Sequence, residues 1–126
     1  MGENNVIHFS SFLSFLFSGK AEAAEIKSDP KGTETDRFLL EWKARSVSPI
    51  SSFKVEYKTM SESRWKEAKP EAYNLPNEDH TYAGTFMIPN LKQATVYLAR
   101  VSSMNDYGYS SPSKLFKFAT EGAGNF

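Results

Sequence analysis

The sequence contains no cysteine, so disulfides, thiolate nucleophiles and cysteine-ligated metals are excluded. It also carries no net charge, because 15 lysines and arginines balance 15 aspartates and glutamates. A neutral chain lacks a global field that would steer it toward nucleic acid, so we expect no nucleic-acid partner. No Asn-x-Ser/Thr acceptor for an N-linked glycan is present either.

Histidine is also scarce, with only His8 and His80 in the chain. His80 follows Asp79 in a polar stretch, and no serine in a nucleophile-elbow context accompanies this pair. The cluster that Glu78 makes with these two residues lacks the spacing of a calcium loop, and there is no glycine-rich phosphate cradle. We therefore predict that the protein is not an enzyme and has no catalytic residue, cofactor or metal.

At 126 residues the chain has room for one domain plus a tail. We assign residues 1–24 to a leader or signal-like segment and linker. Val6–Phe17 is apolar but too short to span a bilayer, which takes about twenty residues. Ala21–Ala23 is a poor signal cleavage site, and the start carries Glu3 but no lysine or arginine. A cleaved signal, the truncated end of a preceding domain and a non-native leader stay open.

From residue 25 onward, apolar and polar residues alternate with the period of two that is typical of a sheet with one buried face. In Asp36–Lys43, for example, Phe38, Leu40 and Trp42 fall on one face. Residues 71–80 carry turn formers and are predicted to be a long loop. The predicted strands are residues 26–28, 36–43, 52–58, 64–69, 82–88, 95–103 and 114–120. This pattern favours an all-β fold, a seven-stranded antiparallel β-sandwich.

The stretch Leu91–Ser113 carries the most specific motif, L-x-x-x-T-x-Y-x-x-x-V-x-x-x-N-x-x-G-x-S-x-P-S. Through this motif, residues 25–120 resemble a fibronectin type III domain, an immunoglobulin-like sandwich, and residues 121–126 form a tail. The chain departs from the family pattern in one place. The usual proline between Leu91 and Thr95 is missing, and Lys92–Ala94 stand there instead.

The resemblance implies structural roles for several residues of the motif and of the earlier strands. Trp42 would fill the space between the sheets, where an immunoglobulin domain often has its disulfide. Tyr97 would form a tyrosine corner, with its hydroxyl bonded to backbone a few residues upstream and Leu91 filling the same corner. Asn105 and Gly108 would suit a tight loop. The expected structural core residues are Trp42, Tyr57, Leu91, Tyr97 and Val101.

The function that the resemblance implies is non-catalytic protein–protein interaction or spacing in an extracellular or cell-surface adhesion protein. Gly19–Ile26 resembles the last strand of an immunoglobulin domain. Together with residues 29–32, it favours the module that follows immunoglobulin domains in neural-type adhesion proteins. The main alternative is a cytoplasmic structural scaffold, which the absence of cysteine and glycan acceptors favours. An accessory domain of a larger secreted enzyme is a third interpretation.

Exposed loop tyrosines are good interface anchors, so the last inter-strand loop is the first candidate partner surface. Its candidate contacts are Asp106, Tyr107 and Tyr109. An Arg-Gly-Asp tripeptide, which this loop carries in some family members, is absent. Integrin capture of that type is therefore not expected.

A basic face on the sheet of the third, sixth and seventh predicted strands is the second candidate. It consists of Lys54, Lys58, Arg100 and Lys117. Such a face would bind heparan sulfate or an acidic partner domain, unless its charges pair with Glu56 and Glu67 across strands. The Trp-Ser-x-Trp-Ser motif of cytokine receptors is absent. We expect a monomeric domain that contacts a protein partner or neighbouring domains.

Overall fold

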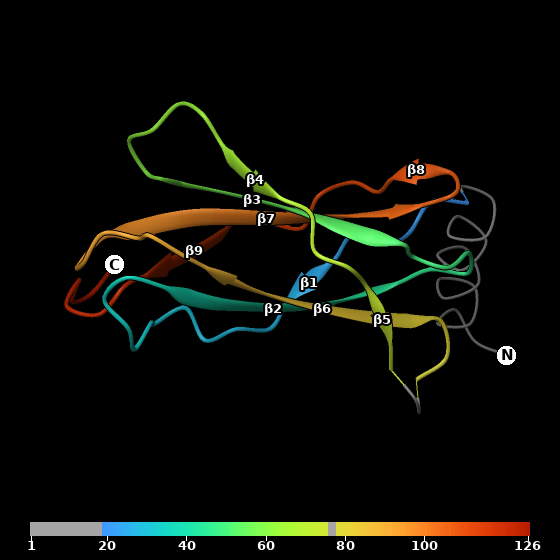
Figure 1. Cartoon of the computed structure of the whole chain (residues 1–126), viewed down its shortest axis with the longest axis horizontal. Helices are drawn as coiled ribbons and strands as arrows, with labels where there is room; N and C mark the ends of the chain where they lie inside the picture. Colours follow the sequence, from blue (N-terminus) through green and yellow to red (C-terminus); the bar gives the residue numbers. More distant parts are fainter. Residues whose placement is uncertain (1–18, 76–77) are drawn as a thin grey trace, which may run out of the picture.

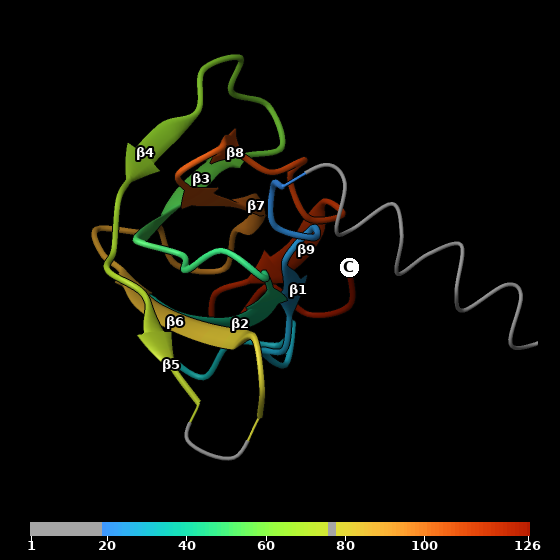
Figure 2. The same cartoon turned by 90° about the vertical axis from the view of Figure 1, so that its right-hand side faces the viewer.

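The computed structural model describes residues 19–75 and 78–126. Their strands form two antiparallel sheets that pack face to face (Figure 1), and Figure 2 shows the two layers from one end. One sheet has four strands in the order β1-β2-β6-β5. The other has five, in the order β4-β3-β7-β8, with β9 also paired to β7. The prediction of an all-β antiparallel sandwich is confirmed.

The four-stranded sheet consists of β1 (Glu25–Ile26), β2 (Phe38–Arg45), β6 (Thr81–Ile88) and β5 (Tyr73–Asn74). The five-stranded sheet consists of β4 (Lys66–Ala68), β3 (Ser52–Thr59), β7 (Val96–Asn105), β8 (Gly108–Tyr109) and β9 (Phe116–Ala119). The described residues thus form nine strands, whereas the sequence predicts seven. The two unpredicted strands, β5 and β8, are two residues long, which is too short to show an alternating pattern.

The core lies between the sheets, where the inward faces of β2, β3 and β7 meet. Trp42 is 1% exposed and lies edge-on to Phe53, with 5.3 Å between the ring centroids. Phe118 stacks between Phe38, at 4.2 Å, and Tyr97, at 5.5 Å. Aromatic rings thus occupy the centre of a sandwich that has no disulfide, and their burial supplies the main stabilising term.

The tyrosine corner lies at the other end of β7 from the β8 turn. The Tyr97 hydroxyl accepts a hydrogen bond from the Lys92 backbone N–H at 2.8 Å, five residues upstream. Thr120 closes the same corner, because its hydroxyl donates to the Lys92 carbonyl at 2.7 Å and accepts from the Thr95 N–H at 3.0 Å. Leu91 is 8% exposed beside them.

The segment between β8 and β9 follows the edge of β7 without forming a regular ladder. The Ser110 hydroxyl accepts the Ser103 N–H, and the Ser113 hydroxyl accepts the Val101 N–H, each at 3.0 Å. These side chains take the place of backbone carbonyls, so the predicted strand 114–120 begins only at Phe116. Pro112, which has no N–H, adds to a sheet edge that a further strand cannot easily join.

The chain enters the sandwich at one end and leaves it at the other (Figure 1). Gly19 lies against the β7–β8 turn, whereas Glu121 accepts a hydrogen bond from Ala94, just before β7 begins. β7 has ten residues, so the two positions are separated by about 30 Å, at roughly 3.3 Å per residue. Residues 19–24 pack on the sandwich, and Ala21 and Ala24 belong to its core. Residues 1–18, with His8, lie outside the described residues.

Candidate interaction surfaces

The β7–β8 turn carries the first candidate surface. It is a two-residue turn, Asp106–Tyr107, closed by the pairing of Asn105 with Gly108, whose φ is +110°. Tyr107 is 62% exposed at the tip. Tyr109 belongs to β8 rather than to the turn and is half-buried, with the Lys54 ammonium 4.5 Å from its ring centroid. The structure therefore separates the two tyrosines that the sequence groups together.

Asn105 is the polar centre beneath this turn and is 4% exposed. Its side-chain nitrogen donates to the Gly19 carbonyl at 2.8 Å and to the Ser46 hydroxyl at 3.0 Å. Its side-chain oxygen accepts the Tyr107 N–H at 2.9 Å. One buried amide thus joins the entering chain, the β2–β3 loop and the turn. The sequence motif predicts a tight loop at Asn105 but gives no signal for its contact with a residue 86 positions away.

The second candidate, the basic face, lies on the outer side of the five-stranded sheet. Arg100 pairs across strands with Glu56, to which it donates two hydrogen bonds of 3.0 and 3.4 Å. Lys58 lies opposite Leu98, which in turn lies opposite the exposed Lys117. The structure therefore brings the four cations to one face and neutralises one of them.

Trp65 is the main residue of this face that charge alone does not reveal. It lies just before β4, half-buried, with the Arg100 guanidinium 4.2 Å and the Lys58 ammonium 5.1 Å from its rings. Lys58 also donates a 2.8 Å hydrogen bond to the Glu62 carbonyl. Cation–π contacts of this kind hold long side chains flat against the sheet. On this outer face, three of the cations thus contact aromatic rings: Lys54 contacts Tyr109, and Lys58 and Arg100 contact Trp65.

The five core residues expected from the sequence occupy the inner faces or the corner. Trp42 and Val101 are essentially inaccessible, and Tyr97 is 4% exposed. Leu91 is buried in the corner, while Tyr57 is only partly buried and packs at the margin of the core. All of them except Tyr57 are covered by protein and present no surface to a partner.

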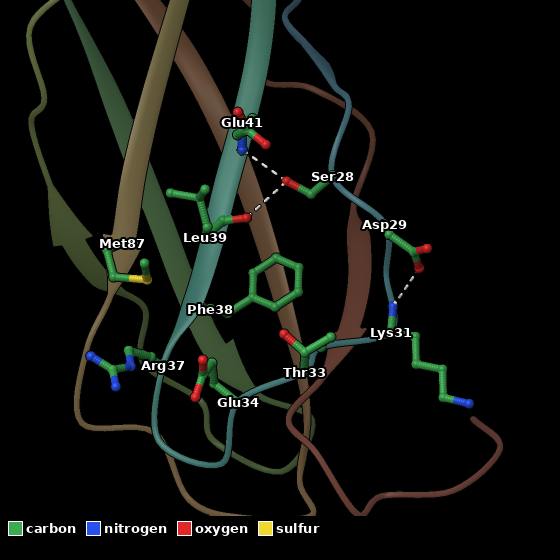
Figure 3. A pocket seen from close by; sticks show the side chains of 11 residues that line it. Ser28, Asp29, Lys31, Thr33, Glu34, Arg37, Phe38, Leu39, Glu41 and Met87 are labelled. Carbon is green, nitrogen blue, oxygen red and sulfur yellow. Dashed lines mark hydrogen bonds between the residues drawn. The ribbon is translucent and has the colours of Figure 1, made fainter.

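The outer face of the four-stranded sheet has an apolar pair that the alternating pattern does not explain. Leu39 and Met87 lie directly opposite each other and are 43% and 47% exposed. They line an open cleft of about 310 Å³, and Ser28 is one of the other residues that line it (Figure 3). The Ser28 hydroxyl accepts the Glu41 N–H and donates to the Leu39 carbonyl, which extends the β1–β2 pairing.

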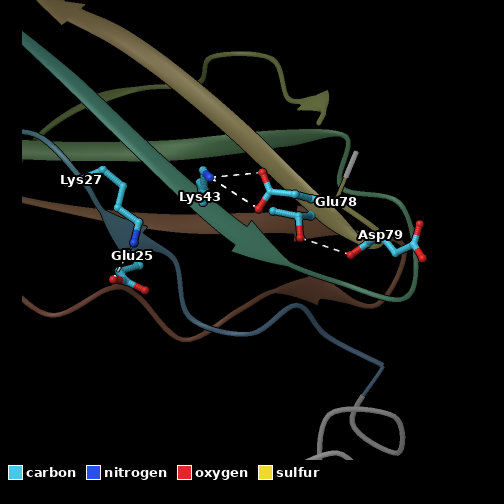
Figure 4. Close-up of polar contacts among 6 residues, drawn as sticks. Glu25, Lys27, Lys43, Glu78 and Asp79 are labelled. Atoms are coloured by element: carbon cyan, nitrogen blue, oxygen red, sulfur yellow. Dashed lines mark hydrogen bonds and ion pairs between the residues drawn. The ribbon is translucent and has the colours of Figure 1, made fainter. Parts of the chain in front are cut away.

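A second cleft, of about 340 Å³, lies near the other end of the same face, and Figure 4 shows the polar contacts of several residues that line it. Its charges are paired: Lys27 contacts Glu25 at 2.7 Å, and Lys43 contacts Glu78 at 3.2 Å. The hydrogen bond and charge of Lys27 lower the pKa of Glu25. Paired charges at the surface form a solvated face rather than a polar site that awaits a ligand.

The described residues, 19–75 and 78–126, contain no cluster of metal-binding side chains. No three acidic or histidine side chains in this part of the chain converge on a point where a metal could bind. His80 lies in the turn before β6 with a φ of 56°, and its carbonyl accepts the Ser46 N–H. Within the same residues there is no helix that is long and apolar enough to cross a membrane.

Comparison with solved structures finds the same sandwich in several proteins. The chain is 16% identical to the structure of a human fourth FNIII domain, covering 86% of this chain and 82% of that one, with a TM-score of 0.57. It is 12% identical to a structure described as a myokine, covering 81% and 96%, with a TM-score of 0.55. A structure of chicken CNTN1 FN1–FN3 domains is 17% identical, covering 77% and 30%, with a TM-score of 0.51.

At these sequence identities the solved structures show only that the fold is shared. No curated protein matches the sequence. The family model for the fibronectin type III domain, however, matches residues 25–118, which is most of the chain. With two antiparallel sheets, a tyrosine corner and a family match over nearly all the described strands, the chain belongs to the fibronectin type III family.

Proposed function

We propose that this domain is a non-catalytic spacer and protein-interaction module of an extracellular or cell-surface adhesion protein. The observation that carries the proposal is the placement of its two ends, about 30 Å apart along β7, at roughly 3.3 Å per residue. A module that the chain enters at one end and leaves at the other adds a fixed length to a rod. Neighbouring domains of the same protein are its first partners.

Protected sheet edges support a monomeric module whose contacts are made through faces and turns. β1 and β5 are two residues long, and β4 is followed by Lys69 and Pro70. Short strands, lysine and proline all disfavour the addition of a strand from another chain. Contacts with a separate protein would then fall to the exposed Tyr107 and Asp106, with Tyr109 at the margin.

Heparan sulfate at the basic face is a weaker candidate within the same proposal. Lys54 and Lys117 project from one face, but Arg100 is paired with Glu56 and Lys58 is bonded to the Glu62 carbonyl. A polyanion would have to compete with these contacts. We expect the domain to elute from a heparin column at a salt concentration below the physiological one. Lys54→Gln should lower this elution concentration no more than Lys31→Gln does, at an exposed control position.

The location of the protein is testable through the fate of its first residues. The extracellular proposal expects secretion or surface display of the full chain with a processed N-terminus. Processing that retains Gly19 would preserve the contacts of Ala21 and Ala24 with the core, whereas cleavage after Ala23 would remove Ala21. A cytosolic product that keeps Met1 would contradict the proposal and favour the cytoplasmic scaffold. Mass spectrometry of the protein from cell and medium fractions distinguishes the two.

The partner surface is testable with purified full chain coupled to beads and offered to intact cells. Changing Tyr107 and Tyr109 to serine should abolish the attachment of the beads to cells. The free energy of unfolding, followed by the melting temperature, should fall by about 1 kcal/mol or less, as for surface positions. The matched control changes Tyr73, a 50% exposed tyrosine on β5, to serine. Equal attachment by all three proteins would overturn the assignment of this turn as a partner surface.

A further inference from the structure

The polypeptide is held tightly where it enters the sandwich. The Gly19 carbonyl accepts the Asn105 side chain at 2.8 Å, and the ring of Tyr107 lies against the Gly19 backbone. Two residues on, Ala21 is 8% exposed within the core, and the Glu22 N–H donates to the end of β2 at 2.9 Å. Residues 19–22 are therefore already packed on the sandwich before β1 begins.

Gly19 is the residue type that this contact requires. Its φ of +72° lies in the left-handed region, which L side chains rarely adopt. A Cβ at this position would lie 2.7 Å from Cγ and Cδ1 of Tyr107 and 3.0 Å from Cδ2. The ring therefore packs on bare backbone, at a distance that only glycine permits.

Asn105 makes the contact cooperative. Its amide is buried and bonds to three segments at once: Gly19, Ser46 in the β2–β3 loop and Tyr107 in the turn. If Gly19 were released, the Asn105 side chain would lose one hydrogen bond in a buried place with little water, which costs free energy. The ring and the amide thus favour the same bound position of Gly19.

We propose that Asn105 and Tyr107 form a clamp that binds the main chain at Gly19 and fixes the path of residues 19–24 onto the sandwich. The occupant of the clamp is this same chain, and its recognition element is a glycine with a left-handed backbone. Val47 and Tyr107, 44% and 62% exposed, lie on the two loops that meet at the clamp. The clamp goes beyond the spacer proposal and does not depend on any adhesive partner.

The other end of the chain supplies an internal reference. Gly124 has the same φ of +72°, but a Cβ there would have no atom within 4 Å. The two glycines thus share their backbone conformation and differ in the presence of a ring.

NMR relaxation and trypsin, applied to the full chain, test the clamp. We expect backbone order parameters near 0.85 for Lys20 and Ala21, and below about 0.6 after Tyr107→Ala, while Tyr107→Phe keeps the ring and the order. Cleavage after Lys20 requires local opening, so Tyr107→Ala should speed it by about tenfold. Cleavage after Lys114, on a different edge, should not change.

The glycine pair separates the clamp from general backbone strain. Gly19→Ala should raise cleavage after Lys20 as Tyr107→Ala does, and the double variant should add little to either change. Gly124→Ala should leave that cleavage unchanged. Order parameters below 0.6 at Lys20 in the unmodified chain, or equal cleavage in Tyr107→Ala and Tyr107→Phe, would overturn the clamp. Because the bead test also substitutes Tyr107, Gly19→Ala separates the two proposals: it opens the clamp but keeps both tyrosines, so it should raise cleavage and leave bead attachment unchanged.

Discussion

Gly84 lies directly opposite Trp42 in the β2–β6 pair, and the indole occupies the space that a side chain at position 84 would need. A Cβ there would come within 2.6 Å of Cε2 and 2.7 Å of Nε1 of Trp42. Glycine in the middle of a strand ordinarily weakens it, because it lacks a side chain to pack. Here its absence of a side chain lets the largest residue of the core lie flat against β6.

Replacing Gly84 by alanine should therefore destabilise the domain, by about 1 to 3 kcal/mol, as overpacking of a tight core does. Urea denaturation followed by tryptophan fluorescence measures the change. In a Trp42→Phe background the smaller ring leaves room, so Gly84→Ala should cost clearly less. The same cost in both backgrounds would show that the indole is not the source of the clash. Thr85→Ala, at the exposed neighbouring position, is the control.

Trp42 itself should be indispensable to the sandwich. Its side chain is 1% exposed and contacts Phe53 edge-on, so truncation to alanine opens a large cavity and should cost about 3 to 5 kcal/mol. That is a large part of the stability of a typical small domain, and we expect Trp42→Ala to be largely unfolded at 25 °C. A cooperative thermal transition near that of the unmodified protein, followed by far-UV circular dichroism, would contradict this. Trp65→Ala, which removes a half-buried surface ring, provides the comparison.

The tyrosine corner should depend on one oxygen atom. Tyr97→Phe keeps the ring stacked on Phe118 but leaves the Lys92 N–H without its acceptor. We expect a loss of about 1 kcal/mol, the usual net contribution of a hydrogen bond. Tyr73→Phe, at an exposed position, should change the free energy of unfolding by far less. Equal effects of the two substitutions would remove the corner from the list of stabilising features.

The turn after β3 should respond to acid through Glu62. The Thr59 N–H donates to its carboxylate at 2.8 Å, and hydrogen bonds from Thr59 lower the pKa of Glu62. A carboxyl group with a lowered pKa in the folded state stabilises the fold above its unfolded pKa, and this contribution is lost as the pH falls through the folded pKa. Carbon-detected NMR titration should therefore place Glu62 below the value of the same residue in urea. The backbone amides of the turn should report the same titration, and their acid-dependent shift should disappear in Glu62→Gln. If these amides still titrate in Glu62→Gln as in the unmodified chain, the assignment to Glu62 is wrong.

Sequence alone was sufficient for the fold because the long strands alternate cleanly. Phe38, Leu40 and Trp42 all point inward as the period of two predicts, and the motif places Tyr97 at its corner. What it could not predict are features without a periodic signal. Two-residue strands show no alternation, and serine side chains that replace carbonyls, as Ser113 does, look like ordinary loop residues.

The candidate surfaces were less accessible to sequence reasoning. The alternation of the strands predicted that Lys54 and Arg100 lie on one face, but the pairing of Arg100 with Glu56 depends on the strand register. The stacking of Trp65 under two cations is a tertiary contact, which the sequence does not reveal. The contact of Gly19 with Tyr107 joins positions 88 residues apart, which no local pattern encodes.

The turn that lacks the family's proline gives the last prediction. Ala94 has a φ of 53°, in the left-handed region, and its N–H donates to the Glu121 carbonyl at 3.1 Å. For a residue with a Cβ this conformation costs about 1 to 2 kcal/mol, and glycine would remove that cost. Part of the gain would be lost, because glycine makes the unfolded chain more flexible and so stabilises the unfolded state. Ala94→Gly should therefore raise the free energy of unfolding by about 0.5 to 1 kcal/mol. Ala23→Gly, at an exposed alanine with a negative φ, should instead lower it slightly, and a loss of stability in both variants would show that position 94 carries no strain.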